Sequence, residues 1–501
     1  MKLTSQRSTL RQVKADAVAV LIPENKSSFE KEIGNLRKYF KRRIDKIIEM
    51  EQFKGKKAEI VGFFTDGAIA TPRILLVGMG EEQKLTLEQY RRSAAAAAKM
   101  AAEFHAKSLA ILLPVGTGKG ISDSQLGMAL AEGTWLSQYV FDKYITTKED
   151  KKDKVKELII ITDDASREKT MRKVLHETRI ICEAACLARD LANAPPNEIY
   201  PESLAAIARR SAAAYGYRAL VWDKPRIEQM KFGGLLAVNA GSNRPPRFII
   251  LEHNAAQKKF KTVVLVGKGV TFDAGGISIK AAGGMSEMKM DMSGAAAVIG
   301  TMEAAARLEL PVHLVGLIPA TENLLGGSAM KPGDIITHFG GKTSEVDNTD
   351  AEGRLILADA LAYASTFKPA AVIDLATLTG ACVVALGQHA TGMMGTGDTV
   401  MADLKEAGEK TFERVWQLPL FEEYEKQIKS DIADVKNVGG RWAGAITAAL
   451  FLKKFIGEYP WVHLDIAGTA ILEESQPYAP KGGSGVGVRL LVEYLKSVKA
   501  E

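Results

Sequence analysis

Short apolar runs alternate with helix-like segments through the first third of the chain. Such runs, bounded by turn residues, are typical of buried strands, and the segments between them have the spacing of helices. The predicted strands are 17–23, 58–64, 73–80, 109–116 and 157–164, and the predicted helices between them are 87–104 and 123–141. This alternation indicates a small α/β domain.

A long helical segment, roughly Ser166 to Asn193, ends before Pro195 and Pro196, which cannot continue a helix. Beyond it the same alternation resumes with the runs FIILEH, TVVLVGKG, VHLVGLIPA, AAVIDLATLTG and WVHLDIAG. The chain has 501 residues, which exceeds one ordinary domain. We therefore predict two α/β domains, with an N-terminal domain at 1–165, a connecting helix at 166–195 and a larger C-terminal domain at 196–501.

Composition and charge narrow the class of protein. No window approaches about 18 uncharged apolar residues, so we expect no membrane span, and the N-terminus lacks an apolar stretch like that of a signal peptide. Three cysteines are too few for a disulfide framework, which favours a cytoplasmic protein. The net charge of +6 is small for this length; it permits nucleic-acid contact without arguing for it. The densest basic run, 37–57, is expected to be an amphipathic helix.

Charged residues gather at the ends of apolar runs in the C-terminal part. Ligands of α/β sheets bind outside the carboxyl ends of the strands, so these residues are the first candidates for a site. Each lies beside a segment that should be buried, where a carboxylate needs a partner or becomes neutral. They are Lys268, Asp273, Lys280, Asp291, Asp350, Glu352 and Arg354.

Two arrangements satisfy this pattern: an ion-pair network with the lysines and Arg354, or bound metal ions. Charge counting favours metal, because the four carboxylates sum to about −4, which two divalent cations would balance. Oxygen ligands without histidine or cysteine suit Mn²⁺, Mg²⁺, or Zn²⁺ bound by carboxylates. Spacing alone does not establish that the three segments meet in space, so both arrangements stay open.

Other catalytic templates fit poorly. The sequence has neither H-E-x-x-H nor G-x-S-x-G, and Ser286 and Lys289 match S-x-x-K without the accompanying S-D-N and K-T-G. The GKG around Lys268 does not satisfy the P-loop pattern. His463 lies in an apolar run and is expected to be a core histidine.

Taken together, these residues resemble the signature of the leucyl (cytosol) aminopeptidase family, of the bacterial aminopeptidase A type. NTDAEGRL at 348–355 carries the resemblance, because it is long and mostly polar. VGKGVTFDAGGISIK, MKMDMSGAA, RDLANAPPNEIYP and HLDIAGTA accompany it in the expected order. The N-terminal third matches only in its general α/β character.

The resemblance implies a metal-dependent aminopeptidase. Such an enzyme releases N-terminal residues, preferably Leu and other apolar ones, from peptides by attack of a metal-bridging hydroxide. It further implies a catalytic C-terminal domain with a central mixed sheet flanked by helices and two divalent ions per subunit, Mn²⁺ or Zn²⁺. Matched position by position, the metal ligands are Lys268, Asp273, Asp291, Asp350 and Glu352, the catalytic pair is Lys280 and Arg354, and the substrate-binding residues are Met288, Asn348, Thr377, Leu378 and Gly380.

Three of these residues have definite chemical requirements. An amine binds metal only when neutral, so the pKa of Lys268 must fall well below its usual ~10.4, through burial and the cation. Lys280 must stay charged to stabilise the developing oxyanion. The family associates Arg354 with a bicarbonate that acts as general base. Met288 and Leu378 fit ordinary core positions equally well.

The resemblance also implies partners. Peptides are the substrates, no membrane is involved, and a homohexamer is expected. A DNA-binding or regulatory role, known for some bacterial relatives, is the alternative that could coexist with catalysis.

Overall fold

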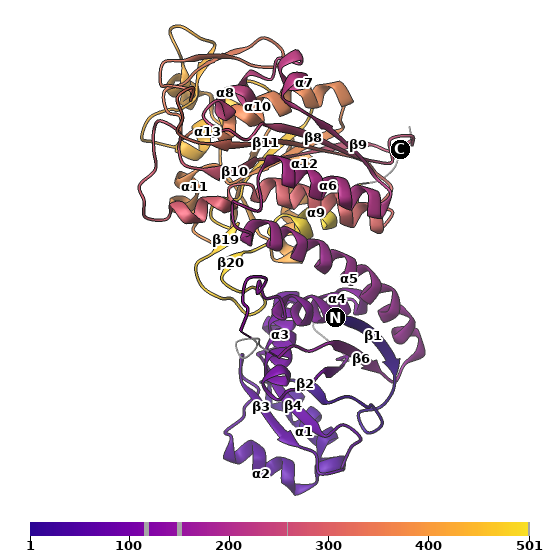
Figure 1. The fold of residues 1–501 in the computed structure, drawn as a ribbon. Coiled ribbons are helices and arrows are strands. Elements are labelled where there is room, and N and C mark those ends of the chain that lie inside the picture. The colour runs from indigo at the N-terminus through magenta and orange to yellow at the C-terminus, as the bar shows by residue number, and fades with distance from the viewer. Residues whose placement is uncertain (115–119, 148–152, 258, 499–501) are drawn as a thin grey trace. The chain divides into compact units, whose positions relative to one another are not determined.

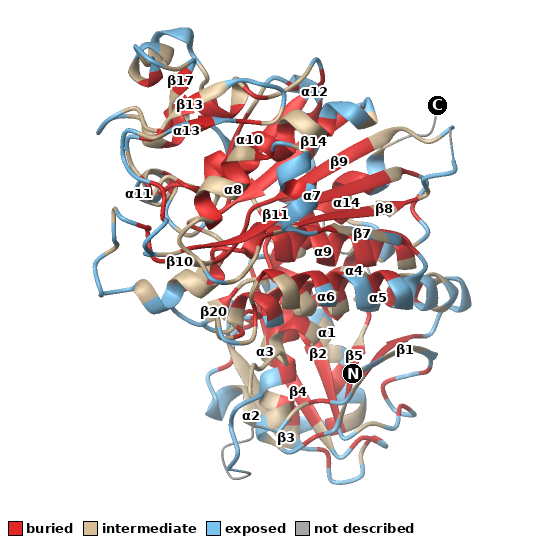
Figure 2. Ribbon diagram, turned by 45° about the horizontal axis from the view of Figure 1, so that its top comes forward, coloured by how far each residue is buried: buried red, intermediate tan, exposed pale blue. Residues whose placement is uncertain are grey.

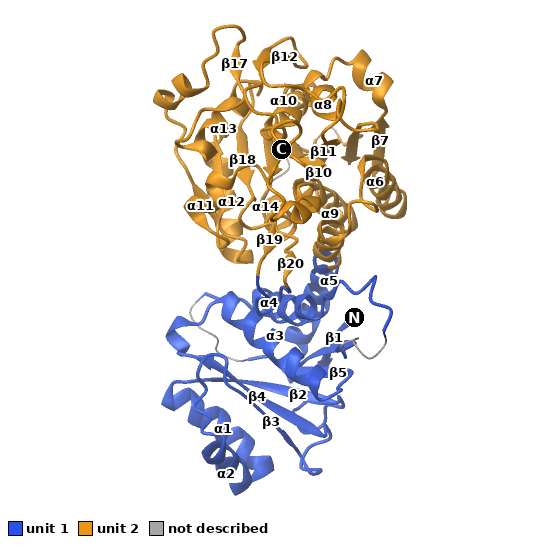
Figure 3. Ribbon diagram, turned by 60° about the vertical axis from the view of Figure 1, so that its left-hand side comes forward, with its two compact units in different colours: residues 1–182, 474–480 blue, residues 183–473, 481–501 orange. Residues whose placement is uncertain are grey.

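The computed structural model describes residues 1–114, 120–147, 153–257 and 259–498, and these form two compact units (Figure 3). Unit 1 comprises Met1–Cys182 together with Glu474–Pro480, and unit 2 comprises Glu183–Glu473 and the chain from Lys481 onward. Helix α5, Ala165–Asn193, contains the first boundary and so contributes turns to both units. The segment 474–480 returns to unit 1 late in the chain, where the Tyr478 hydroxyl donates to Glu88 Oε2 at 2.8 Å.

Unit 1 is built on a sheet in the order β1-β6-β5-β2-β4-β3 (Figure 1). Its neighbours are parallel except for β3, which is antiparallel to β4. The strands are β1 (Lys2–Arg7), β2 (Ala17–Pro23), β3 (Ile60–Phe64), β4 (Arg73–Gly80), β5 (Ser108–Leu112) and β6 (Glu157–Thr162). The helices are α1 (Lys26–Phe40), α2 (Arg42–Met50), α3 (Leu87–Glu103) and α4 (Asp123–Ser137), with a 3-10 turn η1 at Glu82–Lys84.

Both faces of this sheet are covered, which explains the continuous apolar runs. Successive side chains of a strand point to opposite faces. Ala19 and Leu21 of β2 belong to the core beneath α3 and α4, whereas Val20 and Ile22 belong to the core beneath α1 and α2.

The structure departs from the expected elements at two places in unit 1. The basic run 37–57 is not one helix: α1 ends at Phe40, Lys41 takes a φ of 50°, and α2 starts at Arg42. Backbone in this left-handed region cannot continue an α-helix. Strand β1 was not predicted, because KLTSQR is mostly polar; it forms through pairing with β6, an interaction far away in sequence.

Unit 2 has a mixed sheet in the order β16-β15-β18-β14-β9-β11-β8-β7, with β10 paired to β11. Its centre, β18-β14-β9-β11, is parallel, and β8, β7 and β15 run antiparallel to their inner neighbours. The strands are β7 (Arg218–Trp222), β8 (Arg247–His253), β9 (Thr262–Gly267), β10 (Gly269–Asp273), β11 (His313–Asn323), β14 (Ala371–Ala376), β15 (Thr391–Gly395), β16 (Val415–Gln417) and β18 (Trp461–Asp465). Short strands form two small sheets: β12 (Ile335–Thr337), β13 (Thr343–Glu345) and β17 (Val435–Lys436); and β19 (Ile471–Leu472) and β20 (Gly482–Gly483).

Helices cover both faces of the unit 2 sheet (Figure 1). One layer contains α8 (Gly233–Asn239), α10 (Gly353–Ala364) and α13 (Gly444–Lys453); the other contains α6 (Pro201–Tyr215), α9 (Ser293–Arg307) and α14 (Val488–Ser497). The remaining helices are α7 (Lys224–Gln229), α11 (Gly380–Leu386) and α12 (Asp398–Thr411), with 3-10 turns η2 (Met285–Met290), η3 (Ser365–Phe367) and η4 (Glu422–Ile428). The central strands and α9 are buried along most of their length (Figure 2). The predicted fold class, two α/β domains with a central mixed sheet in the larger one, is confirmed.

Within the residues that the structure describes, no helix has both the length and the apolar character needed to cross a bilayer.

Two helical glycines of unit 1 give a matched pair of stability predictions. A Cβ on Gly133 in α4 would lie 2.0 Å from the Arg91 carbonyl oxygen of α3, whereas a Cβ on Gly34 in α1 meets nothing within 4 Å. Gly133→Ala should therefore lower the free energy of unfolding by about 2–3 kcal/mol through overpacking. Gly34→Ala should raise it by about 0.5–1 kcal/mol, because alanine loses less backbone entropy on folding. Thermal unfolding of the full chain measures both, and a neutral Gly133→Ala would contradict the close approach of α3 and α4.

Candidate active site

The charged residues singled out by the sequence lie at the carboxyl ends of the central strands of unit 2. Lys268 follows β9, Asp273 ends β10, and Thr377 follows β14. Asp291 stands just before α9, and Glu352 is the residue that precedes α10. The parallel strands bring these sequence-distant segments to one edge of the sheet, where α/β proteins bind ligands.

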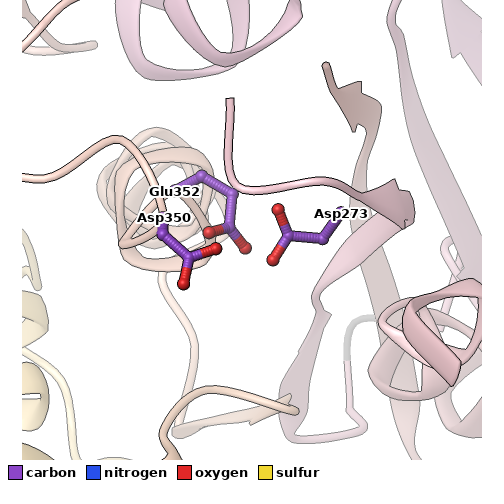
Figure 4. Close-up of side chains that lie close together, drawn as sticks. All are labelled: Asp273, Asp350 and Glu352. Carbon is purple, nitrogen blue, oxygen red and sulfur yellow. The ribbon is translucent and has the colours of Figure 1, made fainter. Parts of the chain in front are cut away.

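Three carboxylates form the centre of the site. One ligand oxygen from each of Asp273, Asp350 and Glu352 lies within 4.8 Å of the others. Figure 4 shows the carboxylates of Asp350 and Glu352, from the segment before α10, turned toward that of Asp273 at the end of β10. Asp273 and Glu352 are buried, and Asp350 is partly open to solvent.

Two lysines connect these carboxylates with Asp291. Lys268 Nζ lies 2.8 Å from Asp291 Oδ2 and 2.8 Å from Glu352 Oε1. Lys280 Nζ lies 2.8 Å from Asp273 Oδ2 and 2.5 Å from Asp350 Oδ1. All five predicted metal ligands and Lys280 therefore belong to one connected cluster.

Burial and mutual repulsion shift the titration of this cluster. Burial raises the pKa of Asp291, Glu352 and Asp350, and neighbouring carboxylates add to the rise. Burial lowers the pKa of Lys268, but Asp291, Glu352 and Asp273 outweigh it, so the pKa lies above its ordinary value. The pKa of Lys280 is also raised, because Asp273 and Asp350 outweigh burial. A neutral Lys268, as its predicted ligand role requires, therefore needs added positive charge beside it.

The donor set fits divalent cations. Four carboxylates face only two ammonium groups. Asp291 Oδ2, Asp350 Oδ1 and Glu352 Oε1 are buried, and within the described residues the ammonium groups of these two lysines are their partners. Buried negative charge in excess of its partners is costly unless cations neutralise it, and oxygen ligands suit hard or borderline ions.

Arg354, the predicted partner of Lys280, is held apart from the carboxylates. It lies in the first turn of α10, is buried, and donates from a terminal guanidinium nitrogen to the Asn437 carbonyl at 2.6 Å. It forms no ion pair with any carboxylate in the described residues, and its Nε has no hydrogen-bond partner among them. Burial lowers the pKa of Arg354 to about 10, a fall that Glu352 and Asp465 limit.

The predicted substrate-binding residues divide into two groups. The Thr377 hydroxyl donates to Asp291 Oδ1 at 2.6 Å, and Asn348 Oδ1 accepts from the Asp350 amide at 2.8 Å, so both touch the cluster. Met288 in η2 is half-buried, and Gly380 begins α11 and is exposed. The Leu378 amide donates to Asp465 Oδ1 at 3.1 Å, and its partly buried side chain packs against the unit 2 core.

Two asparagines that the sequence analysis missed support the cluster. Asn323 Nδ2, at the end of β11, donates to Asp273 Oδ1 at 2.9 Å and to the Thr349 carbonyl at 3.1 Å. Asn437 is fully buried; its Oδ1 accepts from the Asp347 amide at 2.8 Å and its Nδ2 donates to the Asn348 carbonyl at 2.7 Å. Neither residue has a local signal, because each acts on a loop that is distant in sequence.

The glycine of NTDAEGRL, Gly353, is required for steric reasons. A Cβ on Gly353 would lie 2.6 Å from Lys268 Cε and 2.8 Å from its Nζ. Glycine directly after Glu352 therefore lets the ammonium reach that carboxylate, and the side chain pair could not form with a larger residue there.

His463 agrees with its predicted core role. It is fully buried in β18, and its Nδ1 bonds Asp374 Oδ1 on β14 at 2.6 Å.

Comparison with known proteins identifies the class that this fold and site define. The family model described as "Cytosol aminopeptidase family, catalytic domain" matches residues 186–492, and the one described as "Cytosol aminopeptidase family, N-terminal domain" matches residues 17–148. The protein is a peptidase, a hydrolase with an N-terminal α/β domain and a larger catalytic one. The chain belongs to the cytosol aminopeptidase family, and it is an aminopeptidase.

Relatives match over most of the chain. A "Probable cytosol aminopeptidase" of Geotalea uraniireducens (strain Rf4) is 47% identical over 456 residues, covering 91% of this chain and 92% of the relative. Another, of Alkaliphilus oremlandii (strain OhILAs), is 39% identical over 499 residues and covers 100% of both. The resemblance inferred from the sequence is confirmed.

Two solved structures have the same fold. A mutant of tomato leucine aminopeptidase superposes with a TM-score of 0.89 at 32% identity, covering 99% of this chain and 96% of that one. The bottromycin maturation enzyme BotP in complex with Mn gives a TM-score of 0.83 at 33% identity, covering 96% and 99%. The roles given above to individual side chains stay predictions.

Asn437 offers a test of how the loop 347–351, which carries Asp350, is held in place. Asn437→Ala removes an acceptor and two donors that fix the backbone of 347–351 and leaves those groups buried and unpaired. We expect kcat on leucine anilide to fall at least 10-fold and the free energy of unfolding to drop by about 2–3 kcal/mol.

Asn437→Asp keeps the acceptor but sets a carboxylate oxygen against the Asn348 and Ala351 carbonyls. We expect it to lose at least as much kcat as Asn437→Ala, because the buried charge has no partner there. Wild-type kcat in Asn437→Ala would show that the loop holds its shape without this side chain.

Proposed function

We propose that this aminopeptidase is metal-dependent and releases N-terminal Leu and other apolar residues from peptides. One observation carries the proposal: four carboxylates converge on two ammonium groups at the carboxyl ends of the sheet, leaving buried negative charge in excess. The Mn complex of the structural relative BotP supports the choice of a divalent ion.

Two divalent ions per subunit, Mn²⁺ or Zn²⁺, would balance this charge. Lys268, Asp273, Asp291, Asp350 and Glu352 would hold them, with Lys268 giving up its proton to do so. Bound cations there supply a Lewis acid for a peptide carbonyl and lower the pKa of water.

Lys280 contributes a fixed positive charge. Its raised pKa keeps the ammonium protonated at neutral pH, and its side chain is 22% exposed, so a substrate can reach it. Placed beside the scissile carbonyl, this group stabilises the negative charge that develops on the carbonyl oxygen in the transition state.

Arg354 is suited to hold a bicarbonate that acts as general base. A pKa of about 10 leaves the guanidinium charged at neutral pH. Its Nε has no partner among the described residues and can donate to an anion. The carboxylates of the cluster would be engaged by the cations and are contacted by the lysines, so a base held by Arg354 would act in their place.

Selectivity for the first residue of the peptide is assigned to Met288, Asn348, Thr377, Leu378 and Gly380. Thr377 and Asn348 contact the cluster directly, whereas Met288 and Leu378 offer apolar surface. Apolar surface favours a Leu or Met side chain over a charged one, which would be desolvated without a partner.

Assembly as a homohexamer and a cytoplasmic location complete the proposal. A DNA-binding role stays a prediction from the resemblance, and salt-dependent retardation of duplex DNA by the full chain would test it.

Metal dependence is tested by stripping and restoring the ions. We expect chelation to abolish hydrolysis of leucine anilide and Mn²⁺ or Zn²⁺ to restore it, with Leu anilide turned over faster than Asp anilide. Asp350→Ala should reduce restored turnover at least about 100-fold, since even indirect partners of a metal cost 10–100-fold.

Asp431→Ala, which changes an exposed aspartate of unit 2, is the control and should behave as wild type. Circular dichroism should show the Asp350→Ala fold intact. Full restored activity in that variant would contradict its role as a ligand.

Lys280 is tested separately from the ligands. Lys280→Ala should lower kcat about 10²–10³-fold, as loss of one oxyanion donor does, with the metal content per chain unchanged. Lys280→Arg keeps the charge and should lose less. Loss of metal from Lys280→Ala would instead place Lys280 among the ligands.

A further inference from the structure

A cavity of about 490 Å³ opens in unit 1, which does not contain the carboxylate cluster. Its lining includes Pro23 at the end of β2, Leu113 just after β5 and Thr162 at the end of β6. These are the carboxyl ends of neighbouring parallel strands. The volume falls in the range of small-molecule sites, roughly 300–1,000 Å³.

The cavity lies where the strand order of the sheet reverses. From β2 the chain moves to β3 and β4 on one side, and α3 then returns it to β5 on the other side of β2. Open α/β sheets bind their ligands in the crevice at such a reversal, because the helices leave in opposite directions and the loops part.

Both cores of unit 1 contribute apolar walls. Val20 and Leu36 come from the core under α1 and α2, and Leu21, Leu113 and Tyr90 come from the core under α3 and α4. Because adjacent residues of β2 point to opposite faces, the cavity has an apolar wall from each face. Such a space suits a flat ring.

Tyr90 supplies a hydrogen-bond donor without an acceptor. Its residue is only 2% exposed, it lines the cavity, and its hydroxyl makes no hydrogen bond to any residue that the structure describes. Burial, with the nearby Glu82 charge, raises the pKa of Tyr90 to about 12, so the hydroxyl is protonated at neutral pH. Within the described residues the hydroxyl is not among the fully buried polar atoms that lack a partner, so it opens into the cavity, where a ligand atom could accept its hydrogen bond.

The charged residues of the lining narrow the ligand further. Lys31, Lys38 and Arg167 stand against Glu32, Glu82 and Asp163. The Arg167 guanidinium is already paired with both oxygens of Asp123. A polyphosphate would therefore meet three carboxylates, and only Lys31 and Lys38 would remain to bind it. A carboxylate accepts hydrogen bonds from hydroxyl groups. In dinucleotide-binding α/β folds, an acidic residue in the equivalent crevice binds the ribose hydroxyls in this way.

We propose that this cavity binds an uncharged nucleoside. The base lies between the two apolar walls with an acceptor atom toward the Tyr90 hydroxyl, and the sugar hydroxyls donate to Glu32 and Asp163. Peptide hydrolysis in unit 2 does not involve these residues.

Isothermal titration of the full-length protein with adenosine, guanosine, cytidine and uridine tests the site. We expect at least one of them to bind once per chain. Tyr90→Phe should weaken that binding roughly 3- to 10-fold, as loss of one hydrogen bond does. Leu85→Trp, which places a bulky ring at a half-buried lining position, should abolish it. Tyr144→Phe, at a tyrosine that is 54% exposed, is the matched control and should bind as wild type.

Hydrolysis of leucine anilide without nucleoside should be the same in all of these variants, which shows that they fold. No binding of any of the four nucleosides at millimolar concentration overturns the proposal. Binding that survives unchanged in both Tyr90→Phe and Leu85→Trp places the site elsewhere and also overturns it. Tighter binding of AMP or ATP than of adenosine would make the cavity a phosphate site and reject the uncharged class.

Discussion

Repulsion among four carboxylates, three of them buried, is the constraint on which the catalytic unit depends. Asp273, Asp291, Asp350 and Glu352 reach one edge of the sheet, where little water can screen them. Lys268 and Lys280 offset part of this charge, and Asp291 and Glu352 also stand just before α9 and α10, where helix N-termini favour anions. The remaining excess opposes folding, and in the proposed function cations would neutralise it, so the same repulsion would serve the chemistry.

Close backbone approach makes this concentration of charge geometrically feasible. A Cβ on Gly294, in the first turn of α9, would lie 2.1 Å from the Leu375 carbonyl oxygen of β14, and one on Gly353 would meet the Lys268 side chain. Glycine at both positions lets the N-termini of α9 and α10 pack closely against the end of β14 and against Lys268. Asn323 and Asn437 then fix the loops between them through backbone groups. The loops that carry the carboxylates are thus held by two uncharged side chains, while Lys268 and Lys280 contact the carboxylates themselves.

Unit 1, like unit 2, has a sheet whose parallel strands end at one edge, but different residues follow those strands. Its parallel strands also end at one edge, but their lining there balances cations against carboxylates and is walled by apolar residues from two cores. One sheet edge therefore carries an excess of carboxylates, and the other carries balanced charges between apolar walls. The difference lies in the residues that follow the strands, since both sheets provide the same kind of edge.

The sequence by itself indicated the fold class, because short continuous apolar runs between helix-like segments are typical of covered strands. It indicated the family and the residues of the cluster through the resemblance, because NTDAEGRL is long and polar enough to be specific. Tertiary structure alone decided which lysine pairs with which carboxylate, that Asn323 and Asn437 hold the loops, that β1 joins the sheet, and that 474–480 belongs with unit 1. Local patterns record burial and turns, whereas all of these contacts except that between Lys280 and Asp273 join segments separated by tens to hundreds of residues. Their energies depend on positions in space that no short stretch of sequence encodes.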